Sequence, residues 1–591
     1  MKKTLCIILM IIVGLLAFSN ELNSSEKKSR QLFSESLELL FKEKKFDARL
    51  KLNEAMNGEV YLNDIPKFWY YAAKLDLQLG LIEKAKEDIN NILLFTNQDE
   101  EVETLLNFIR TMENFSLTNY STPSYYEIVK ISGNKDAFER FYTIDDLEII
   151  NSTAYLLDSK NNLIFKSNNF EEKWIKLPKD KKFNTIASDK NLNRIYLGSE
   201  KGIYYFEPST KFSYKEISED STPLLTPNTS EENFKILKEN IQAYILGVDR
   251  AGRIISYNPY LNQINYTGYD GSDLNILNFK NDEIFIDGKI YNNKIFLLER
   301  KNRQIYIYDE LKNAIIQKIK LPDKDYLSIE ILPWGKILVS TLEDSIEIEK
   351  DGEFYKLNDE EFIGKLKIKN GIFIKNNLQN YEVSLNRLYN QNDLNMYNLN
   401  VYGLNFNKED LTVTAKFNSN TLSGEIIEYP TKDISVEDSG GRVAFDYYRI
   451  YSKTNTYEFE NMDDFFQTGI SQIKTDSKII LKNEINQNFE IKSLIPILIT
   501  GSSIYYVNSE QEIPQSFIDM IYYSGGIIMP EKYHDYLKDY LNNSYKPMDY
   551  LKYSVYPPLI EGIKQTKVSL NLSDKILSDT LYYYTEGVGS E

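Results

Sequence analysis

Four segments of the chain differ in how apolar and polar residues alternate. Residues 5–18 are a short apolar run, and residues 30–115 repeat apolar side chains at helical spacing. Residues 125–388 alternate with a period of two, which is typical of half-buried strands, whereas residues 398–591 alternate strand-like with helix-like runs. The pattern predicts a multidomain protein with an α-helical domain, then an all-β domain, then an α/β open sheet.

The helical segment places large and small residues at regular positions. Small side chains let two antiparallel helices approach, and a glycine permits the turn between them. The residues at these positions are Trp69, Ala72, Ala73, Gly80, Ala85 and Ile89. The segment resembles about two tetratricopeptide repeats (TPR), although Ala48 and Ala85 are 37 residues apart instead of about 34; we attribute the excess to an insertion at 57–64. A plain bundle of helical hairpins is the alternative, and both predict a surface that binds a peptide or protein.

The central segment repeats a strand, a polar turn and a second strand. Successive units are 41, 48, 52, 42 and 35 residues apart, and they start at Tyr155, Tyr196, Tyr244, Phe296, Leu338 and Phe373. Strand-rich periods of about 40 to 50 residues indicate a β-propeller. The segment resembles six-bladed propellers with NHL-like or quinoprotein-like hairpins. A sandwich or a β-helix would also produce repeated hairpins.

The last segment resembles a bacterial von Willebrand factor A-type (vWA) domain. We expect strands at 411–417, 433–437, 448–451, 478–481, 495–500, 526–529, 550–556 and 568–572, with helices at 462–473, 514–523 and 531–541. The family holds a divalent metal with carboxylates after its first and fourth strands. Here residues 452–456 and 501–503 contain no Asp or Glu. The resemblance therefore implies a degenerate domain that has lost its metal site.

The N-terminus has the form of a secretory signal peptide over residues 1–19. Lys2 and Lys3 precede the apolar run, and Ala17 and Ser19 are small residues at the positions that a signal peptidase reads. The run is shorter than the roughly 20 residues that cross a bilayer, although an uncleaved anchor is the alternative. We expect an exported protein of the periplasm or cell surface with no integral span after cleavage.

Composition excludes several kinds of site. The 591 residues include one His and one Cys, too few for a Cys/His zinc site or a disulfide scaffold. The net charge of −18 argues against nucleic-acid binding. His534 begins the polar face of a predicted helix. Segment 189–200 has the side-chain spacing of a calcium loop, but Arg194 stands where such a loop requires Gly. We therefore predict no catalytic, cofactor-binding or metal-binding residue.

These observations favour a non-enzymatic scaffold that binds other proteins. Resemblance alone places it in a bacterial envelope assembly such as a flagellar motor collar or a secretion apparatus. Trp174 and Trp334 are the candidate aromatic contacts with a partner. The alternative is a glycan-binding protein or a carboxylate-dependent enzyme that uses the propeller funnel. Converging acidic residues about 5 to 9 Å apart would favour the enzyme, whereas a filled mouth would favour the scaffold.

Overall fold

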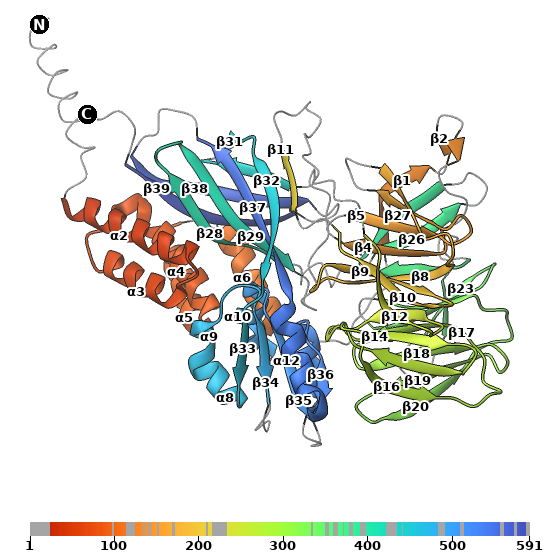
Figure 1. Ribbon diagram of the computed structural model, residues 1–591. Helices are drawn as coiled ribbons and strands as arrows, with labels where there is room; N and C mark the ends of the chain where they lie inside the picture. Colours follow the sequence, from red (N-terminus) through yellow and green to blue (C-terminus); the bar gives the residue numbers. More distant parts are fainter. Residues whose placement is uncertain are drawn as a thin grey trace, which may run out of the picture.

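The chain forms a helical layer, a β-propeller and a mixed body of strands and helices (Figure 1). The computed structural model describes residues 24–96, 100–113, 124–132, 134–135, 138–139, 144–150, 153–167, 172–208, 211–215, 233–332, 335–348, 354–357, 364–369, 372–377, 382–389, 398–420, 434–439, 441–482, 491–508, 513–555, 561–571 and 576–586. The predicted signal peptide lies outside these residues. Among the helices that are described, none combines the length and the apolar character that crossing a bilayer demands.

The helical layer consists of two antiparallel hairpins and a further helix, in agreement with the helical period of its sequence. Its elements are α2 (Ser24–Phe41), α3 (Lys45–Met56), η1 (Leu62–Asp64), α4 (Ile65–Gln78), α5 (Ile82–Leu93) and α6 (Glu100–Glu113). Ala72, Ala73 and Ala85 are fully buried where helices meet. Gly80 ends α4 with a φ of +77°, a conformation that favours glycine.

One buried arginine connects three helices of this layer. The Arg49 guanidinium on α3 donates two hydrogen bonds to Asp76 on α4, at 2.8 and 2.9 Å, and lies 3.5 Å from Asp88 on α5. Arg49 therefore faces two buried carboxylates, and the exposed Lys84 lies 4.0 Å from Asp76. Burial and the neighbouring Asp76 raise the pKa of Asp88 to about 7.

We expect Asp88→Asn to stabilise the protein at pH 8 and to leave it nearly unchanged at pH 4. Because the folded-state pKa is raised from 3.8 to about 7, the stability contributed by protonated Asp88 is complete below pH 4 and is lost as the pH rises to 7. Chemical denaturation should give a gain of at least about 1 kcal/mol at pH 8, which corresponds to less than one pKa unit. Glu87→Gln is the control, because Glu87 is the exposed neighbour of Asp88. Equal effects of the two variants would contradict the assignment of the gain to burial of Asp88.

Six four-stranded antiparallel sheets form the propeller. The first three are β4 (Asp146–Ile150), β5 (Thr153–Asp158), β6 (Leu163–Ser167) and β7 (Glu172–Lys176); β8 (Phe183–Asp189), β9 (Arg194–Ser199), β10 (Gly202–Phe206) and β12 (Lys235–Glu239); and β13 (Tyr244–Val248), β14 (Ile254–Asn258), β15 (Gln263–Thr267) and β16 (Asp273–Asn278). The others are β17 (Phe285–Tyr291), β18 (Lys294–Glu299), β19 (Gln304–Asp309) and β20 (Ala314–Lys320); β21 (Ser328–Ile331), β22 (Ile337–Ser340), β23 (Ser345–Ile348) and β24 (Phe354–Leu357); and β25 (Lys367–Lys369), β26 (Ile372–Asn377), β27 (Glu382–Tyr389) and β1 (Ser124–Ser132). We number these sheets as blades 1 to 6.

The ring of blades is closed. Each innermost strand contacts the next, in the cyclic order β4, β8, β13, β17, β21, β25 and back to β4. Strand β1, which comes first in the sequence, pairs antiparallel with β27 and completes the last blade. The predicted propeller is therefore confirmed, and a small hairpin of β2 (Asn134–Lys135) and β3 (Phe138–Glu139) accompanies it.

One of the six predicted repeats starts at a different strand of its blade from the others. Tyr244 begins the innermost strand of blade 3, whereas Tyr196 lies in the second strand of blade 2. The cause is an insertion between β10 and β12 that carries β11 (Lys211–Lys215). Strand β11 leaves the propeller and pairs with β32 of the body.

The body contains two antiparallel sheets and one parallel sheet. The antiparallel sheets have the orders β11-β32-β37-β29-β28 and β31-β30-β38-β39, and the parallel sheet has the order β33-β34-β35-β36. Their strands are β28 (Asn398–Asn407), β29 (Thr412–Asn420), β30 (Ile434–Asp438), β31 (Gly441–Arg442), β32 (Asp446–Lys453), β33 (Thr456–Phe459), β34 (Lys478–Leu481), β35 (Ser503–Asn508), β36 (Ile528–Pro530), β37 (Tyr545–Ser554), β38 (Gly562–Asn571) and β39 (Ile576–Thr585). The helical elements are α8 (Met462–Asp464), η4 (Phe465–Gly469), α9 (Ile470–Gln472), η5 (Ile491–Leu494), α10 (Ile495–Thr500), α11 (Gln515–Tyr523), η6 (Glu531–Tyr533) and α12 (His534–Asn543).

The prediction of a vWA-like open sheet at 398–591 is not supported, because antiparallel sheets dominate this region. The expected first strand, 448–451, belongs to antiparallel strand β32. The expected strand 495–500 is helix α10, in which Pro496 occupies the first turn and all six residues are buried. Burial on every side removes the periodicity that separates helix from strand. The four parallel strands also lie side by side in the order in which they occur in the sequence. The sheet therefore lacks the reversal of strand order next to which open α/β sheets bind their ligands.

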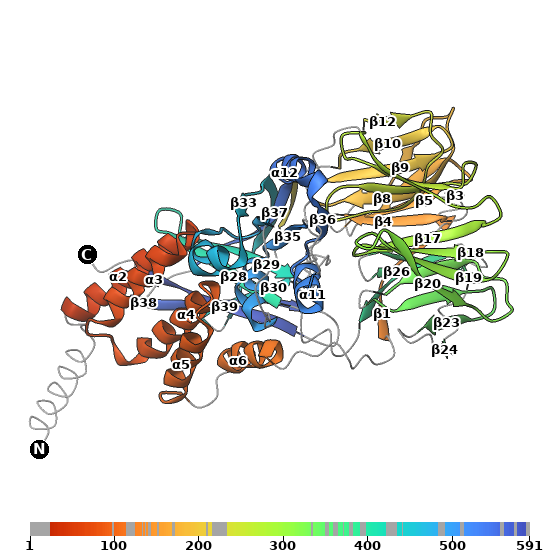
Figure 2. The same cartoon turned by 90° about the horizontal axis from the view of Figure 1, so that it is seen from below.

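The three units share continuous apolar cores. One core joins α2 to α6 with both antiparallel sheets and with one face of the parallel sheet. The opposite face of the parallel sheet, with Ile480, Tyr505 and Met529, packs with α12 against Leu192 and Ala251 at propeller turns. Figures 1 and 2 show the body between the helical layer and the propeller.

Candidate functional site

Charged side chains line the centre of the propeller, the usual place to look for a ligand in this fold. They stand at alternate positions of four innermost strands and so share one face of each strand. These residues are Asp146 and Glu148 on β4, Asp287 and Lys289 on β17, Glu330 on β21, and Lys367 and Lys369 on β25. All of them are buried or nearly so.

We call these seven charged residues at the centre of the propeller the channel. Its three lysines pair with its carboxylates. Lys289 lies 3.0 Å from Glu330 on the next blade, and Lys369 lies 3.3 Å from Glu148. Lys367 of blade 6 lies 3.8 Å from Asp287 of blade 4. This ion pair therefore connects two blades that are not neighbours in the ring. Side chains from different blades therefore meet near the axis of the ring.

The carboxylates also bind the backbone of neighbouring innermost strands. Asp146 accepts a hydrogen bond from the N–H of Ile186 at 3.0 Å, and Asp287 accepts one from the N–H of Ile329 at 3.1 Å. Glu148 accepts the N–H of Ser188 at 3.0 Å. Each of these bonds connects one blade to the next. The carboxylates thereby satisfy donors that regular strand pairing inside a blade leaves unpaired.

The channel perturbs the pKa of its groups in both directions. Burial raises the pKa of Glu330 despite the adjacent Lys289, and burial lowers the pKa of Lys289. Burial alone would raise the pKa of Asp146, but attraction by Lys367, Lys369 and Lys289 outweighs it and lowers that pKa. The charges of the channel are therefore mutually compensating.

Lys367→Met should lower the free energy of unfolding by about 3 kcal/mol at pH 7, because it removes the cation that pairs with buried Asp287. The depressed pKa of Asp146 contributes stability that is present above the unfolded pKa and is lost as the pH falls. Because the folded-state pKa of Asp146 lies below 3.8, this contribution is intact between pH 7 and pH 4, and the deficit of the variant should shrink only below about pH 4 in chemical denaturation. Exposed Lys365 lies two residues earlier, and Lys365→Met should cost little; a pH-independent deficit would contradict this account.

The channel resembles a structural network more than an acid–base pair. A glycosidase requires one carboxylate that donates a proton and a second that attacks or activates water. Here Asp146, Glu148, Asp287 and Glu330 each bind a backbone N–H or a lysine. His, Cys, Asp and Glu of the described residues also form no group of three suited to a metal ion.

The residues singled out in the sequence do not gather at one site. Trp69 is half-buried, whereas Ala72, Ala73, Ala85 and Ile89 are buried in the helical layer. Trp174 lies on the outer strand β7 of blade 1 with 45% of its surface exposed. Trp334 lies outside the described residues. His534 begins α12 with Glu458 at 3.2 Å and Asp535 at 3.3 Å, and no described nucleophile is paired with it.

The body covers one side of the helical layer, whereas Phe46 and Leu50 of α3 remain exposed. Helix α2 packs on β28 and β39, and α4 packs on α10. Lys74 of α4 donates to Asp579 at 2.5 Å and to the carbonyls of Val401 and Thr580 at 3.1 Å. Since Val401 and Thr580 belong to β28 and β39, Lys74 connects the facing edges of two sheets. Lys74 and Asp579 form what we call the sheet seam.

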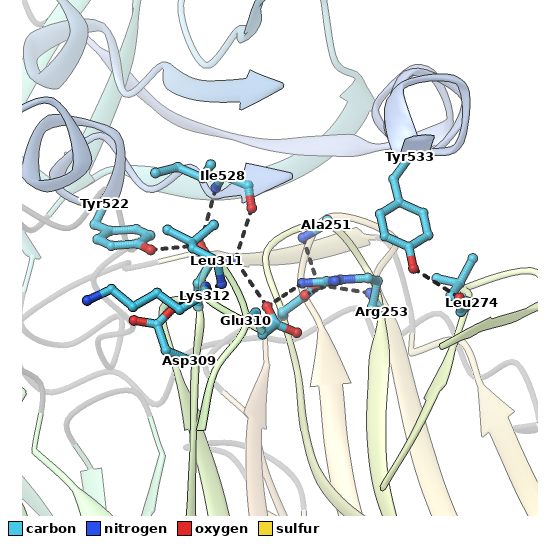
Figure 3. A network of polar contacts seen from close by, with 12 residues as sticks. Ala251, Arg253, Leu274, Asp309, Glu310, Leu311, Lys312, Tyr522, Ile528 and Tyr533 are labelled. Atoms are coloured by element: carbon cyan, nitrogen blue, oxygen red, sulfur yellow. Dashed lines mark hydrogen bonds and ion pairs between the residues drawn. The ribbon is translucent and has the colours of Figure 1, made fainter. Parts of the chain in front are cut away.

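A polar junction between propeller and body escaped the sequence analysis (Figure 3). Asn293 donates to the carbonyl of Ile528 at 2.9 Å and to Glu310 at 3.0 Å, and it accepts from the Tyr522 hydroxyl at 2.7 Å. Glu310 also pairs with Arg253 at 2.9 Å. On the propeller side, Asn293, Glu310 and Arg253 occupy turns at the ends of strands, where polar residues are ordinary in sequence.

The second half of this junction centres on Tyr540 of α12. Its hydroxyl lies 3.0 Å from Asp189 and 3.0 Å from the side-chain amide of Asn191. The segment that begins at Asp189 is thus a turn of blade 2 that holds the body. Burial raises the pKa of Asp189 to about 6. Gly252 of blade 3 lies against the same ring.

Comparison with known proteins gives no family. No protein-family model matches the chain, and no curated protein matches it. Solved structures that resemble it include virginiamycin B lyase from Staphylococcus aureus, at 13% identity and a TM-score of 0.28, which covers 50% of this chain and 95% of its own. Luciferin-regenerating enzyme is 11% identical with a TM-score of 0.31, and the match covers 45% of this chain and 95% of that one. The WD40 propeller domain of Doa1 is 11% identical with a TM-score of 0.28, and the match covers 45% of this chain and 97% of that one. Likenesses this distant carry no argument about activity, and the propeller of this chain rests on its own closed ring of sheets.

Proposed function

We propose that this chain is a non-enzymatic scaffold that binds other proteins after export to the periplasm or cell surface. The observation that carries the proposal is the channel network, in which the carboxylates hold blades together. A propeller of this kind presents a rigid surface. The predicted signal peptide is the support for export.

The face of the propeller away from the body carries exposed aromatic and aliphatic side chains. The turns after β13 and β17 bind the body through Gly252 and Asn293, so the turns after β14 and β22 lie at the opposite ends of their blades. They carry Tyr260 with 82% and Leu342 with 75% of their surfaces exposed. Exposed aromatic and aliphatic residues on a rigid support are typical of protein interfaces.

The test is capture of partners from the envelope fraction of the source organism by the tagged full chain. We expect the same proteins to remain bound after a high-salt wash, and the double variant Tyr260→Asp/Leu342→Asp to lose them. Leu94→Asp is the matched control, since Leu94 is 80% exposed at the end of α5 in the helical layer. A chain that captures nothing and instead cleaves glycans, with loss of cleavage in Glu148→Gln, would overturn the proposal.

A further inference from the structure

Blade 4 has the opposite charge to the rest of the protein. Residues 285–321 contain eight basic and four acidic side chains, a net charge of +4, in a chain whose total is −18. The next blade, residues 328–357, contains three basic and seven acidic side chains, a net charge of −4. Blade 6, residues 124–132 and 367–389, contains five basic and two acidic side chains, a net charge of +3, so blade 4 is not the only basic blade, and it borders an acidic one.

The acidic residues of blade 4 are turned inward, whereas most of its basic residues, apart from Lys289 in the channel, are turned outward. Asp287 lies in the channel, Glu299 is fully buried, and Glu310 pairs with Arg253 at the body junction. The exposed basic residues lie at both ends and along the outer strand of the blade, and they are Lys294, Arg300, Lys301, Lys312, Lys318 and Lys320. Because the acidic side chains are buried, basic residues outnumber acidic ones at the surface of this blade by more than they do in its sequence.

The outer strand of blade 4 combines this charge with an unpaired edge. Strand β20 is the last strand in its sheet, at the rim of the propeller (Figure 1). Its first five residues, 314–318, are all exposed, and Ile315 and Ile316 keep 39% and 40% of their surfaces exposed. An exposed strand edge with apolar side chains is a template for pairing with another strand.

We propose that the blade 4 edge, defined as β20 with Lys312, binds an extended acidic segment of a partner protein as a fifth strand. This inference rests on the proposed scaffold function and specifies the chemistry of one partner. Backbone hydrogen bonds along β20 supply affinity, and Ile315 and Ile316 contact apolar side chains of the segment. Lys312, Lys318 and Lys320 attract its carboxylates, and Lys318 also lies 3.5 Å from Glu283.

Other occupants fit the edge less well. A second copy of this chain that paired through the same edge would bring two blades of net charge +4 together, and like charges repel. A polyphosphate or a nucleic acid would use the lysines but neither the backbone edge nor the two isoleucines. An acidic peptide uses all three features.

The experiment measures binding of the full chain to the labelled peptide Glu-Val-Glu-Val-Glu-Val-Glu by fluorescence anisotropy, with the Lys-for-Glu peptide as a control. We expect the acidic peptide alone to bind and the double variant Lys318→Glu/Lys320→Glu to weaken it about tenfold, with less effect in high salt. Lys173→Glu/Lys176→Glu reverses two exposed charges on outer strand β7 of blade 1 and should bind as the wild type does.

Amide hydrogen exchange identifies strand addition. The acidic peptide should slow exchange within residues 314–320, whereas inorganic polyphosphate should not. Equal affinity for polyphosphate without slowed exchange, or no peptide binding, would overturn the inference. The envelope capture separates the two proposals: if wild type and the double variant at Lys318 and Lys320 retain the same partners, this inference fails while the scaffold stands, and if the wild type captures nothing, the scaffold fails.

Discussion

Lys74→Met should lower the free energy of unfolding by about 3–5 kcal/mol, as expected when one partner of a buried ion pair is removed. Lys74 is 5% exposed, and its three bonds reach Asp579 and the carbonyls of two sheet edges. Without the ammonium, Asp579 stays buried as an uncompensated charge. Its remaining partners include the N–H of Val401 at 2.5 Å and the hydroxyl of Tyr70 at 3.4 Å.

Chemical denaturation of the full chain measures this loss, with Lys42→Met as control. Lys42 pairs with Glu38 at 3.8 Å on the surface, where such pairs contribute about 0–1 kcal/mol. The double variant Lys74→Met/Asp579→Asn should lose less than the sum of its single variants, by more than about 1 kcal/mol, because the amide keeps an acceptor for Val401 without a buried charge. Strict additivity would show that the sheet seam is not a coupled pair.

Gly252→Leu should detach the propeller from the body. Gly252 has a φ of +70°, and a Cβ there would lie 2.2 Å from the ring of Tyr540. The backbone conformation costs a non-glycine residue about 1–2 kcal/mol, and overpacking costs about 1–3 kcal/mol more. Tyr540 has little freedom to move away, because its hydroxyl is held by Asp189 and Asn191.

Amide hydrogen exchange of the Gly252→Leu variant shows which segments lose protection. Exchange should accelerate in α12 and in the turn at 249–253, while the channel strand β17 keeps its protection. Gly441→Leu is the matched control, since Gly441 is exposed and its Cβ would meet no atom closer than 3.8 Å. Unchanged exchange in α12 would contradict the assignment of Gly252 to the junction.

The periodicity of the chain was sufficient to predict the helical layer and the propeller. Short apolar runs such as those of β13 and β18, with one recurring turn per unit, need only local sequence. Local sequence could not reveal that the insertion carrying β11 shifts the phase of blade 3, because β11 pairs with the distant strand β32. It also misassigned 495–500, where burial on all sides erases the pattern.

The sites depend still more on tertiary contacts. The charged residues of the channel, such as Asp146 and Lys367, look like ordinary polar positions of strands, and they meet only because a closed ring brings six innermost strands around one axis. Lys74 and Asp579 are 505 residues apart, and nothing near either one marks it as buried. The sequence by itself determined the order of helical and β-rich units, because period and turn chemistry are local properties. Only the tertiary structure decided which charges are buried together, because that depends on which faces the units present to each other.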